Sequence, residues 1–193
     1  MSEGFEGLNP PYSTIVADPP WAYDEGWPMS NGQGQRGNKG RKPLGYSSMT
    51  LDEMAALRLG LLADGDSHLY LWTTSRYLRD AFDLVGIWGF HPSQTLTWCK
   101  PPRGIGPGGA FSSTTEFVIF ARHGSLKAKA RVDSTWWEWS REGHSRKPAA
   151  FYDLVEQVSP GPYVELFARQ PRLGWDSWGH GYELPAPEDD GSE

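Results

Sequence analysis

Short apolar runs alternate along the sequence with segments that carry helix signals, and this alternation is the strongest constraint on the fold. The strand-like runs are at residues 14–17, 68–72, 95–98, 117–120 and 163–167. The predicted helices run from Thr50 to about Leu59, from Arg76 to Val85, and from Pro148 to about Val158. Strands separated by helices predict an α/β fold, with a mostly parallel sheet covered by helices on both faces.

Three local signals set the expected helix boundaries. Thr50 and Glu53 have the spacing of a capping box, in which each side chain satisfies a backbone N–H at the start of a helix. Gly86 is expected to end the second helix, because glycine readily adopts the conformation that follows a helix. Pro148 suits the first turn of the third helix.

The length of 193 residues predicts a single domain over residues 1–183, followed by an acidic disordered tail at 184–193. Cys99 is the only cysteine, so no disulfide framework is expected, and we predict no metal site. No signal peptide and no apolar run of about 18 to 20 residues is evident, which indicates a cytoplasmic protein without membrane spans.

The sequence after the first strand has an unusual composition. Asp18-Pro19-Pro20-Trp21 follows residues 14–17 directly, and ligands of parallel sheets bind beyond the carboxyl ends of strands. One interpretation is an ordinary turn, since Asp-Pro and Pro-Pro are common turn pairs. The other is a site for a planar amine, with oxygen acceptors from Asp18 and Pro19 and a stacking ring from Trp21. The four residues alone favour neither interpretation.

Seven ordered stretches carry a resemblance to a known family. They are Val16–Trp21, Tyr46–Met49 leading into Glu53-Met54, Leu71–Thr74, Trp88–Phe90 with Trp98–Lys100, His144–Pro148, Glu165–Arg169 with Gly174-Trp175, and Trp178-Gly179. From Ile15 to His180 the chain resembles the adenine-N6 methyltransferases that include the catalytic subunit of the messenger-RNA adenosine methyltransferase. It is most similar to the small bacterial and phage members of that family.

The resemblance implies a Rossmann-like methyltransferase fold and S-adenosylmethionine as cofactor. It implies methyl transfer to the N6 amino group of adenine in nucleic acid, and we favour DNA because the chain looks like the compact prokaryotic type. RNA methylation is the enzymatic alternative. A catalytically silent nucleic-acid-binding subunit is the alternative from another class, since some relatives lose the chemistry. The intact Asp18–Trp21 motif argues for catalysis.

The resemblance also implies roles for matching positions. Asp18 to Trp21 would hold the target amine, and Lys147 would face the methionine carboxylate of the cofactor. Phe167 and Arg169 would line its ribose and adenine. The expected substrate site is walled by Tyr46, Trp72, Trp98, Lys100 and His144, although core packing explains the two tryptophans equally well. Glu116 opens a strand at a position often acidic in relatives, and structural and functional roles are equally open.

Two departures from the family pattern bear on binding. His180 stands where the family usually has a cofactor-contacting asparagine, so this contact is in question, although histidine can both donate and accept a hydrogen bond. The seventeen residues before Asp18 leave little room for a further strand that helps to hold the cofactor in larger relatives.

The net charge of −6 argues against a strongly basic nucleic-acid surface, so phosphate contacts must come from local clusters. The best such cluster is Arg36, Lys39, Arg41 and Lys42 in a loop at 24–48, which we expect to contact the nucleic-acid backbone; a solvated loop is the simpler alternative. The Gly-rich loop at 101–115 lacks a Walker motif and is expected to be flexible. Specificity must come from these loops, from a partner subunit or from a homo-oligomer.

Overall fold

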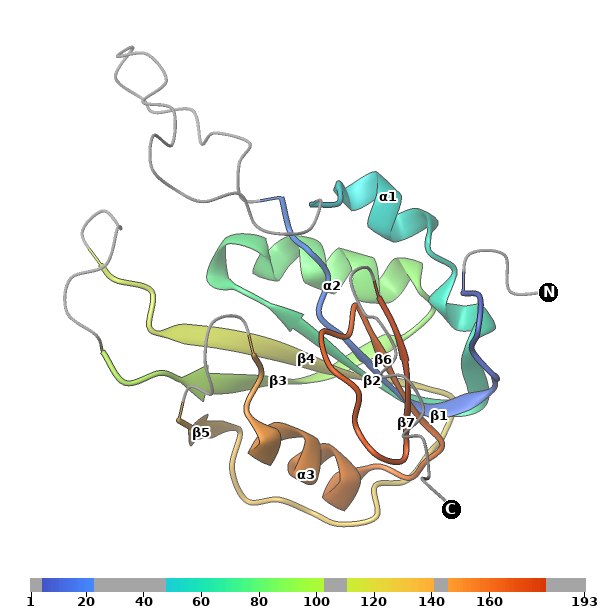
Figure 1. The fold of residues 1–193 in the computed structure, drawn as a ribbon. Helices are drawn as coiled ribbons and strands as arrows, with labels where there is room; N and C mark the ends of the chain where they lie inside the picture. The colour runs from blue at the N-terminus through green and yellow to red at the C-terminus, as the bar shows by residue number, and fades with distance from the viewer. Residues whose placement is uncertain (1–4, 23–47, 103–110, 141–145, 180–193) are drawn as a thin grey trace, which may run out of the picture.

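The computed structural model describes residues 5–22, 48–102, 111–140 and 146–179 (Figure 1). It contains one seven-stranded sheet with the order β5-β3-β4-β2-β1-β6-β7. The strands are β1 (Tyr12–Ala17), β2 (Ala63–Thr73), β3 (His91–Cys99), β4 (Thr115–His123), β5 (Trp136–Glu138), β6 (Tyr163–Leu166) and β7 (Trp175–Trp178). The helices are α1 (Leu51–Ala56), α2 (Leu78–Ile87) and α3 (Ala149–Val158), with short 3₁₀ turns η1 (Leu59–Leu61) and η2 (Ser75–Tyr77).

The sheet is mostly parallel, as predicted. β4 pairs antiparallel with both β2 and β3, whereas β1 pairs parallel with β2 and β6, β3 with β5, and β6 with β7. β4 is therefore the one reversed strand of the described sheet. All the other strands place their carboxyl ends at the same edge, where ligands of such sheets bind.

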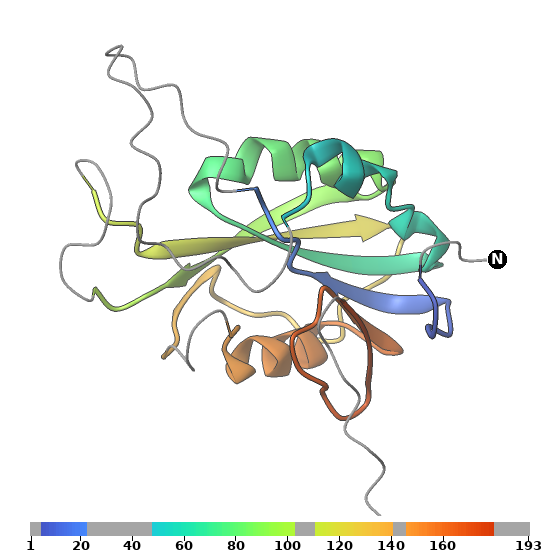
Figure 2. The same ribbon diagram turned by 45° about the horizontal axis from the view of Figure 1, so that its top comes forward.

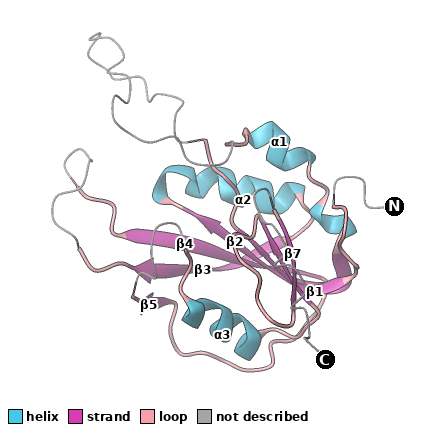
Figure 3. Ribbon diagram, in the orientation of Figure 1, coloured by secondary structure: helices cyan, strands magenta, loops and turns pink. Residues whose placement is uncertain are grey.

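Helices cover both faces of the sheet, which confirms the predicted α/β arrangement (Figures 2 and 3). Alternate residues of one strand face opposite sides. Ile15 and Ala17 of β1 belong to the cluster under α1 and α2, whereas Val16 belongs to the cluster that includes Phe151 and Val155 of α3.

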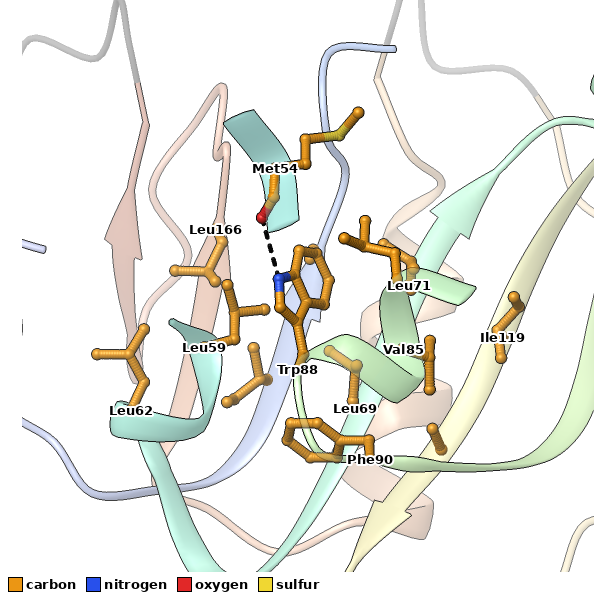
Figure 4. Packing of buried hydrophobic residues seen from close by; sticks show 14 of the residues in the cluster. Met54, Leu59, Leu62, Leu69, Leu71, Val85, Trp88, Phe90, Ile119 and Leu166 are labelled. Carbon is orange, nitrogen blue, oxygen red and sulfur yellow. Dashed lines mark hydrogen bonds between the residues drawn. The ribbon is translucent and has the colours of Figure 1, made fainter. Parts of the chain in front are cut away.

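The cluster under α1 and α2 is centred on Trp88, which follows α2 (Figure 4). Its indole Nε1 donates to the backbone oxygen of Met54 at 3.0 Å, so this buried polar atom is satisfied. The contact ties α1 to the end of α2. Both helices are thereby held over the sheet.

The predicted capping box is present. The Thr50 side chain accepts from the Glu53 N–H at 3.2 Å, and the Glu53 carboxylate accepts from the Thr50 N–H at 2.7 Å. The prediction for Gly86 is wrong, because α2 continues to Ile87. Gly89 has the positive φ of 87° that lets the chain turn back into β3. Pro148 is the N-cap of α3, one residue before its first turn.

β5 and β7 are strands that the sequence analysis did not predict. They are three and four residues long, and both begin with tryptophan. Neither has the apolar β-branched run by which the other strands were recognised. Within the part of the chain that the structure describes, no helix is long and apolar enough to cross a membrane.

Candidate active site

Asp18 lies at the edge of the sheet where β1 and β6 end. Its N–H donates to the backbone oxygen of Leu166 at 3.3 Å, so the end of β1 is tied to the end of β6. Its side chain is 12% exposed and lines a cleft of about 160 Å³. The cleft is lined by Asp18, Arg146, Lys147, Ala149, Tyr152, Glu165, Phe167, Arg169, Gln170, Pro171 and Arg172. The structure therefore brings together four residues of the predicted site: Asp18, Lys147, Phe167 and Arg169.

Cations surround the Asp18 carboxylate. Lys147 Nζ lies 3.0 Å from Asp18 Oδ1, and Arg169 Nη2 lies 3.7 Å from Asp18 Oδ2. Lys147 comes from the segment just before α3 and Arg169 from the segment after β6. Both oxygens of Asp18 therefore have a positively charged neighbour.

Lys147 also contacts a second carboxylate. Its Nζ lies 3.0 Å from Glu116 Oε2, and Glu116 Oε1 forms a further ion pair with Lys100. An alternating row of charges thus runs from Asp18 through Lys147 and Glu116 to Lys100. It crosses from the end of β1 to the start of the reversed strand β4 and the end of β3, on the edge where ligands bind.

Burial and pairing act in opposite directions on the pKa values of this row. Burial favours neutral Lys147, but Asp18 and Glu116 outweigh burial and raise the pKa of the lysine. Burial likewise favours neutral Glu116, but Lys147 and Lys100 outweigh burial and lower the pKa of the carboxyl. Lys147 and Glu116 are therefore both charged at neutral pH, and each depends on its partners.

Glu165 is the other acid of the cleft, and it comes from β6. It is 7% exposed, and its Oε1 accepts from the Tyr152 hydroxyl at 2.6 Å. Burial raises the pKa of Glu165 to about 7, and the nearby Asp18 charge acts in the same direction, while the Tyr152 hydrogen bond opposes them. The cleft therefore holds one carboxyl that titrates near neutral pH.

The raised pKa of Glu165 gives a stability prediction. The folded state holds the proton more tightly than the unfolded chain, so the free energy of unfolding decreases as pH rises from about 4.5 to about 7. Glu165→Gln, which resembles the protonated acid, should leave stability nearly unchanged at pH 5. At pH 8 it should stabilise by about 2–3 kcal/mol, because one pKa unit corresponds to about 1.4 kcal/mol.

Urea denaturation of both proteins at pH 5 and pH 8 measures this difference. Glu138→Gln, at an exposed carboxylate of β5, serves as the control and should show no such pH dependence. Equal effects of Glu165→Gln at the two pH values would contradict the raised pKa.

The backbone on the far side of the cleft has two unusual positions. Phe167 has a φ of 64°, a left-handed conformation that is rare for a bulky residue and characteristic of functional sites. A Cβ added to Gly179 would lie 2.7 Å from the Ala168 backbone oxygen, so only glycine fits there. The chain thus turns sharply after β6 and is closely backed by the segment after β7.

Pro19 and Trp21 make contacts that the sequence analysis did not predict. Pro19 is buried, and its carbonyl oxygen already accepts from the Trp21 N–H at 2.9 Å. The Trp21 ring is buried, stacks on Tyr77 with centroids 5.1 Å apart, and donates its Nε1–H to the Trp72 oxygen. In this structure the ring therefore fixes the motif to β2 and is not available to stack on a base. Pro20 accepts from the Met49 N–H at 2.9 Å, which ties the motif to the start of α1.

Trp72 and Trp98 belong to the core, in agreement with the core-packing alternative given for them in the sequence analysis. Both are buried in the cluster on the α3 face. Both rings contact lysines of the charged row. Lys147 Nζ lies 4.5 Å from the centre of the Trp72 ring, and Lys100 Nζ lies 4.6 Å from the centre of the Trp98 ring. Such cation–π contacts stabilise the two lysines in the row.

Several predicted residues lie outside the described part of the chain: Arg36, Lys39, Tyr46, His144 and His180. Their roles stay predictions. The lining residues that the site prediction did not include are Arg146, Ala149, Tyr152, Glu165, Gln170, Pro171 and Arg172. The signal for Glu165 was its charge within an apolar strand, because a buried acid in a strand requires a partner. Nothing in the sequence marks Tyr152, rather than the neighbouring Phe151 of α3, as a residue of the cleft.

A mostly parallel α/β sheet with a charged cleft at the ends of β1 and β6 is consistent with a Rossmann-like methyltransferase fold. The chain belongs to the MT-A70 family, whose model matches residues 12–181. It is 30% identical over 186 residues to the type II methyltransferase M.MunI of a Mycoplasma species, covering 90% of this chain and 78% of that protein.

Two further relatives have names that include their substrates. The N6-methyladenosine RNA methyltransferase MTA1 of Cryphonectria parasitica is 28% identical over 187 residues, which cover 91% of this chain and 53% of MTA1. The human N(6)-adenosine-methyltransferase catalytic subunit METTL3 is 25% identical over 166 residues, which cover 82% of this chain. The chain spans only 26% of the length of METTL3.

Proposed function

We propose that this protein transfers a methyl group from S-adenosylmethionine to the N6 amino group of adenine in DNA. The observation that carries the proposal is the Asp18 carboxylate, held at the rim of the cleft between Lys147 and Arg169. Membership of the MT-A70 family supports methyl transfer. The adenosine N6 position is named in the MTA1 and METTL3 relatives. We propose DNA as the polymer because the chain covers 78% of the type II methyltransferase M.MunI, a larger share than of MTA1 or METTL3.

The cleft has groups that fit S-adenosylmethionine, which supplies an electrophilic methyl group on a sulfonium when bound. Lys147 and Arg169 can neutralise the carboxylate of its amino-acid part. Glu165 and Asp18 can face its positive groups, and the raised pKa of Glu165 would fall as such a charge approaches. Phe167, in its left-handed turn, lines the same cleft.

Asp18 has the chemistry to activate an aromatic amine. The lone pair of such an amine is delocalised into the ring, so the nitrogen must become more tetrahedral before it attacks. An N–H donated to the Asp18 carboxylate favours this change and stabilises the positive charge that develops on nitrogen. A strong base is not required.

The target amine must compete for Asp18 with its present partners. Lys147 has a second carboxylate, Glu116, at the same distance of 3.0 Å. When an amine takes Asp18 Oδ1, Lys147 therefore keeps a countercharge and stays ionised. The ion pair between Lys100 and Glu116 keeps the Glu116 carboxylate in place as the second partner of Lys147.

Methyl transfer to matched oligonucleotides tests the proposal. Purified protein is incubated with S-adenosylmethionine carrying a labelled methyl group and with adenine-containing DNA or RNA of the same sequence. We expect label at adenine N6 in DNA and a lower kcat/KM for RNA. A higher kcat/KM for RNA than for DNA would show that RNA is the preferred substrate. Cofactor binding in calorimetry without transfer to either polymer would instead indicate a silent subunit.

A further inference from the structure

The segment after β6 forms one wall of the cleft. We call residues 167–172 the wall segment, of which Phe167, Arg169, Gln170, Pro171 and Arg172 line the cleft. The wall segment passes beside α3, which contributes Ala149 and Tyr152 to the lining (Figures 1 and 2). Because the wall segment is not a strand of the sheet, its place beside α3 depends on side-chain contacts.

Arg172 connects the wall segment to α3 through two carboxylates. Its Nε donates to Glu156 Oε1 at 2.9 Å, and its Nη2 donates to Asp153 Oδ1 at 2.8 Å. The hydrogen bond from Arg172 lowers the pKa of Glu156, so this acid is charged at neutral pH. Residues three apart share one face of a helix, and the rigid planar fork of a guanidinium can serve two such acceptors at once. Arg172 thus fixes the end of the wall segment to one face of α3.

The Glu156 carboxylate also holds the start of β7. The Trp175 Nε1 donates to Glu156 Oε1 at 2.8 Å, and the Trp175 N–H donates to the Arg172 oxygen at 3.1 Å. The Trp175 ring stacks on Tyr163 of β6 with centroids 4.7 Å apart. Glu156 therefore accepts from both ends of the turn that follows the wall segment, and this turn is packed against the sheet.

Arg172 also reaches the buried acid of the cleft, through Tyr152. The Arg172 guanidinium lies 5.2 Å from the centre of the Tyr152 ring, and the Tyr152 hydroxyl donates to Glu165 Oε1 at 2.6 Å. A cation over the face of an aromatic ring is attracted to it. Nearer the start of the wall segment, Arg169 contacts Asp18. The wall segment is thus held to Asp18 on one side and to α3 on the other.

We propose that Arg172 is a positioning residue for S-adenosylmethionine, which it serves by holding the wall segment against α3 before the cofactor binds. A site that is already ordered spares binding the free energy of ordering it. Two carboxylates already occupy the guanidinium, so Arg172 acts through α3 and not as a direct partner of the cofactor. The inference rests on the proposed function, because it takes S-adenosylmethionine as the molecule bound in the cleft.

Calorimetric binding of S-adenosylmethionine, without nucleic acid, tests the role of Arg172. Arg172→Gln should raise the Kd about 10-fold, because the free energy of ordering the wall segment then falls on binding. Arg172→Lys should recover only part of the affinity, since an ammonium lacks the planar fork. The matched control is Arg79→Gln, at an exposed arginine of α2, which should leave the Kd unchanged.

Glu156→Gln distinguishes positioning from direct contact with the cofactor. If Arg172 acts through α3, Glu156→Gln should also raise the Kd, and adding it to Arg172→Gln should cause little further loss, since substitutions of contacting residues are not additive. If Arg172 bound the cofactor directly, Glu156→Gln would release the guanidinium and leave the Kd unchanged or lower it. This second result would overturn the inference.

Amide hydrogen exchange of the cofactor-free protein gives a readout that does not depend on activity. Arg172→Gln should accelerate exchange at the Trp175 N–H, which is bonded to the Arg172 oxygen, while the amides of β1 and β2 keep the parent rates. Faster exchange throughout the sheet would indicate a general loss of stability and would contradict a positioning role.

The kinetic constants separate this inference from the proposed function. Arg172→Gln should raise the KM for S-adenosylmethionine by about the same factor as the Kd, with a much smaller effect on kcat, because Asp18 is retained. If the parent protein methylates neither polymer but binds the cofactor more tightly than the Arg172 and Glu156 variants do, the proposed function alone is overturned. If the parent protein methylates DNA and the Arg172 variants bind the cofactor as tightly as the parent does, the inference alone is overturned.

Discussion

Asp18→Asn is expected to lower kcat for methyl transfer by about 10³-fold while the protein remains folded. The neutral amide keeps one acceptor oxygen but loses the negative charge that stabilises the developing positive charge on the target nitrogen. Removing one such preorganised group from an active site costs roughly 10²- to 10³-fold. Asp18 also holds Lys147 and Arg169, so their positions in the cleft become less defined as well.

The assay compares single-turnover transfer rates of the parent and the variant, with circular dichroism to verify folding. The control is Asp83→Asn, which removes an exposed carboxylate from α2 and should retain the parent rate. If the Asp18 variant kept more than a tenth of the parent rate, the Asp18 carboxylate would not be needed for methyl transfer. The proposed function would then lack its central group.

Most of the fold could be predicted because the central strands have strong local signals. Residues 14–17 and 68–72 are apolar because helices bury both of their faces, and this leaves a pattern in the sequence. β5 and β7 lie at the two edges of the sheet, where burial is incomplete and the pattern fades. The reversed direction of β4 was not predicted, although its signal is in the sequence: a loop at 101–115, and no helix, joins the strands at 95–98 and 117–120, whereas parallel neighbours usually need a crossover helix.

The site was predicted in part for a similar reason. Asp18, Lys147, Phe167 and Arg169 lie together because strand ends and their adjoining segments meet at one edge of the sheet. What the sequence could not provide is the partner of each group. The Trp21 ring stacks on Tyr77 and Asp18 pairs with Lys147, and both contacts join segments far apart in the chain. Neither could be deduced from local composition.

The Asp18 carboxylate is already paired with Lys147 when no substrate is bound. The carboxylate that should accept the target amine is already bound by two cations, so substrate binding is an exchange of partners. The exchange costs little free energy because Lys147 keeps Glu116 as a negative neighbour, and Lys100 pairs with Glu116 in turn. The lysine is therefore a structural member of the site, in addition to the contact with the cofactor that we propose for it.

Lys147→Met is expected to lower the free energy of unfolding by about 3 kcal/mol at pH 8, and to weaken binding of S-adenosylmethionine. Breaking a buried ion pair by removing one partner typically costs roughly 3–5 kcal/mol, because the remaining charge is left uncompensated. Here Glu116 keeps Lys100 and Asp18 keeps Arg169, which places the loss at the low end. Lys127→Met, at an exposed lysine, should change stability by less than about 0.5 kcal/mol.

The pH dependence of this loss identifies its cause. Without Lys147, burial acts on Glu116 with less opposition, so the pKa of the carboxyl rises toward or above its ordinary value. The variant then regains stability relative to the parent as pH falls from 8 to 5, because protonation removes the uncompensated charge. Adding Glu116→Gln should restore part of the stability at pH 8 in urea denaturation. If the loss is the same at both pH values and Glu116→Gln adds to it, lost packing against Trp72 and not charge explains the effect of the lysine.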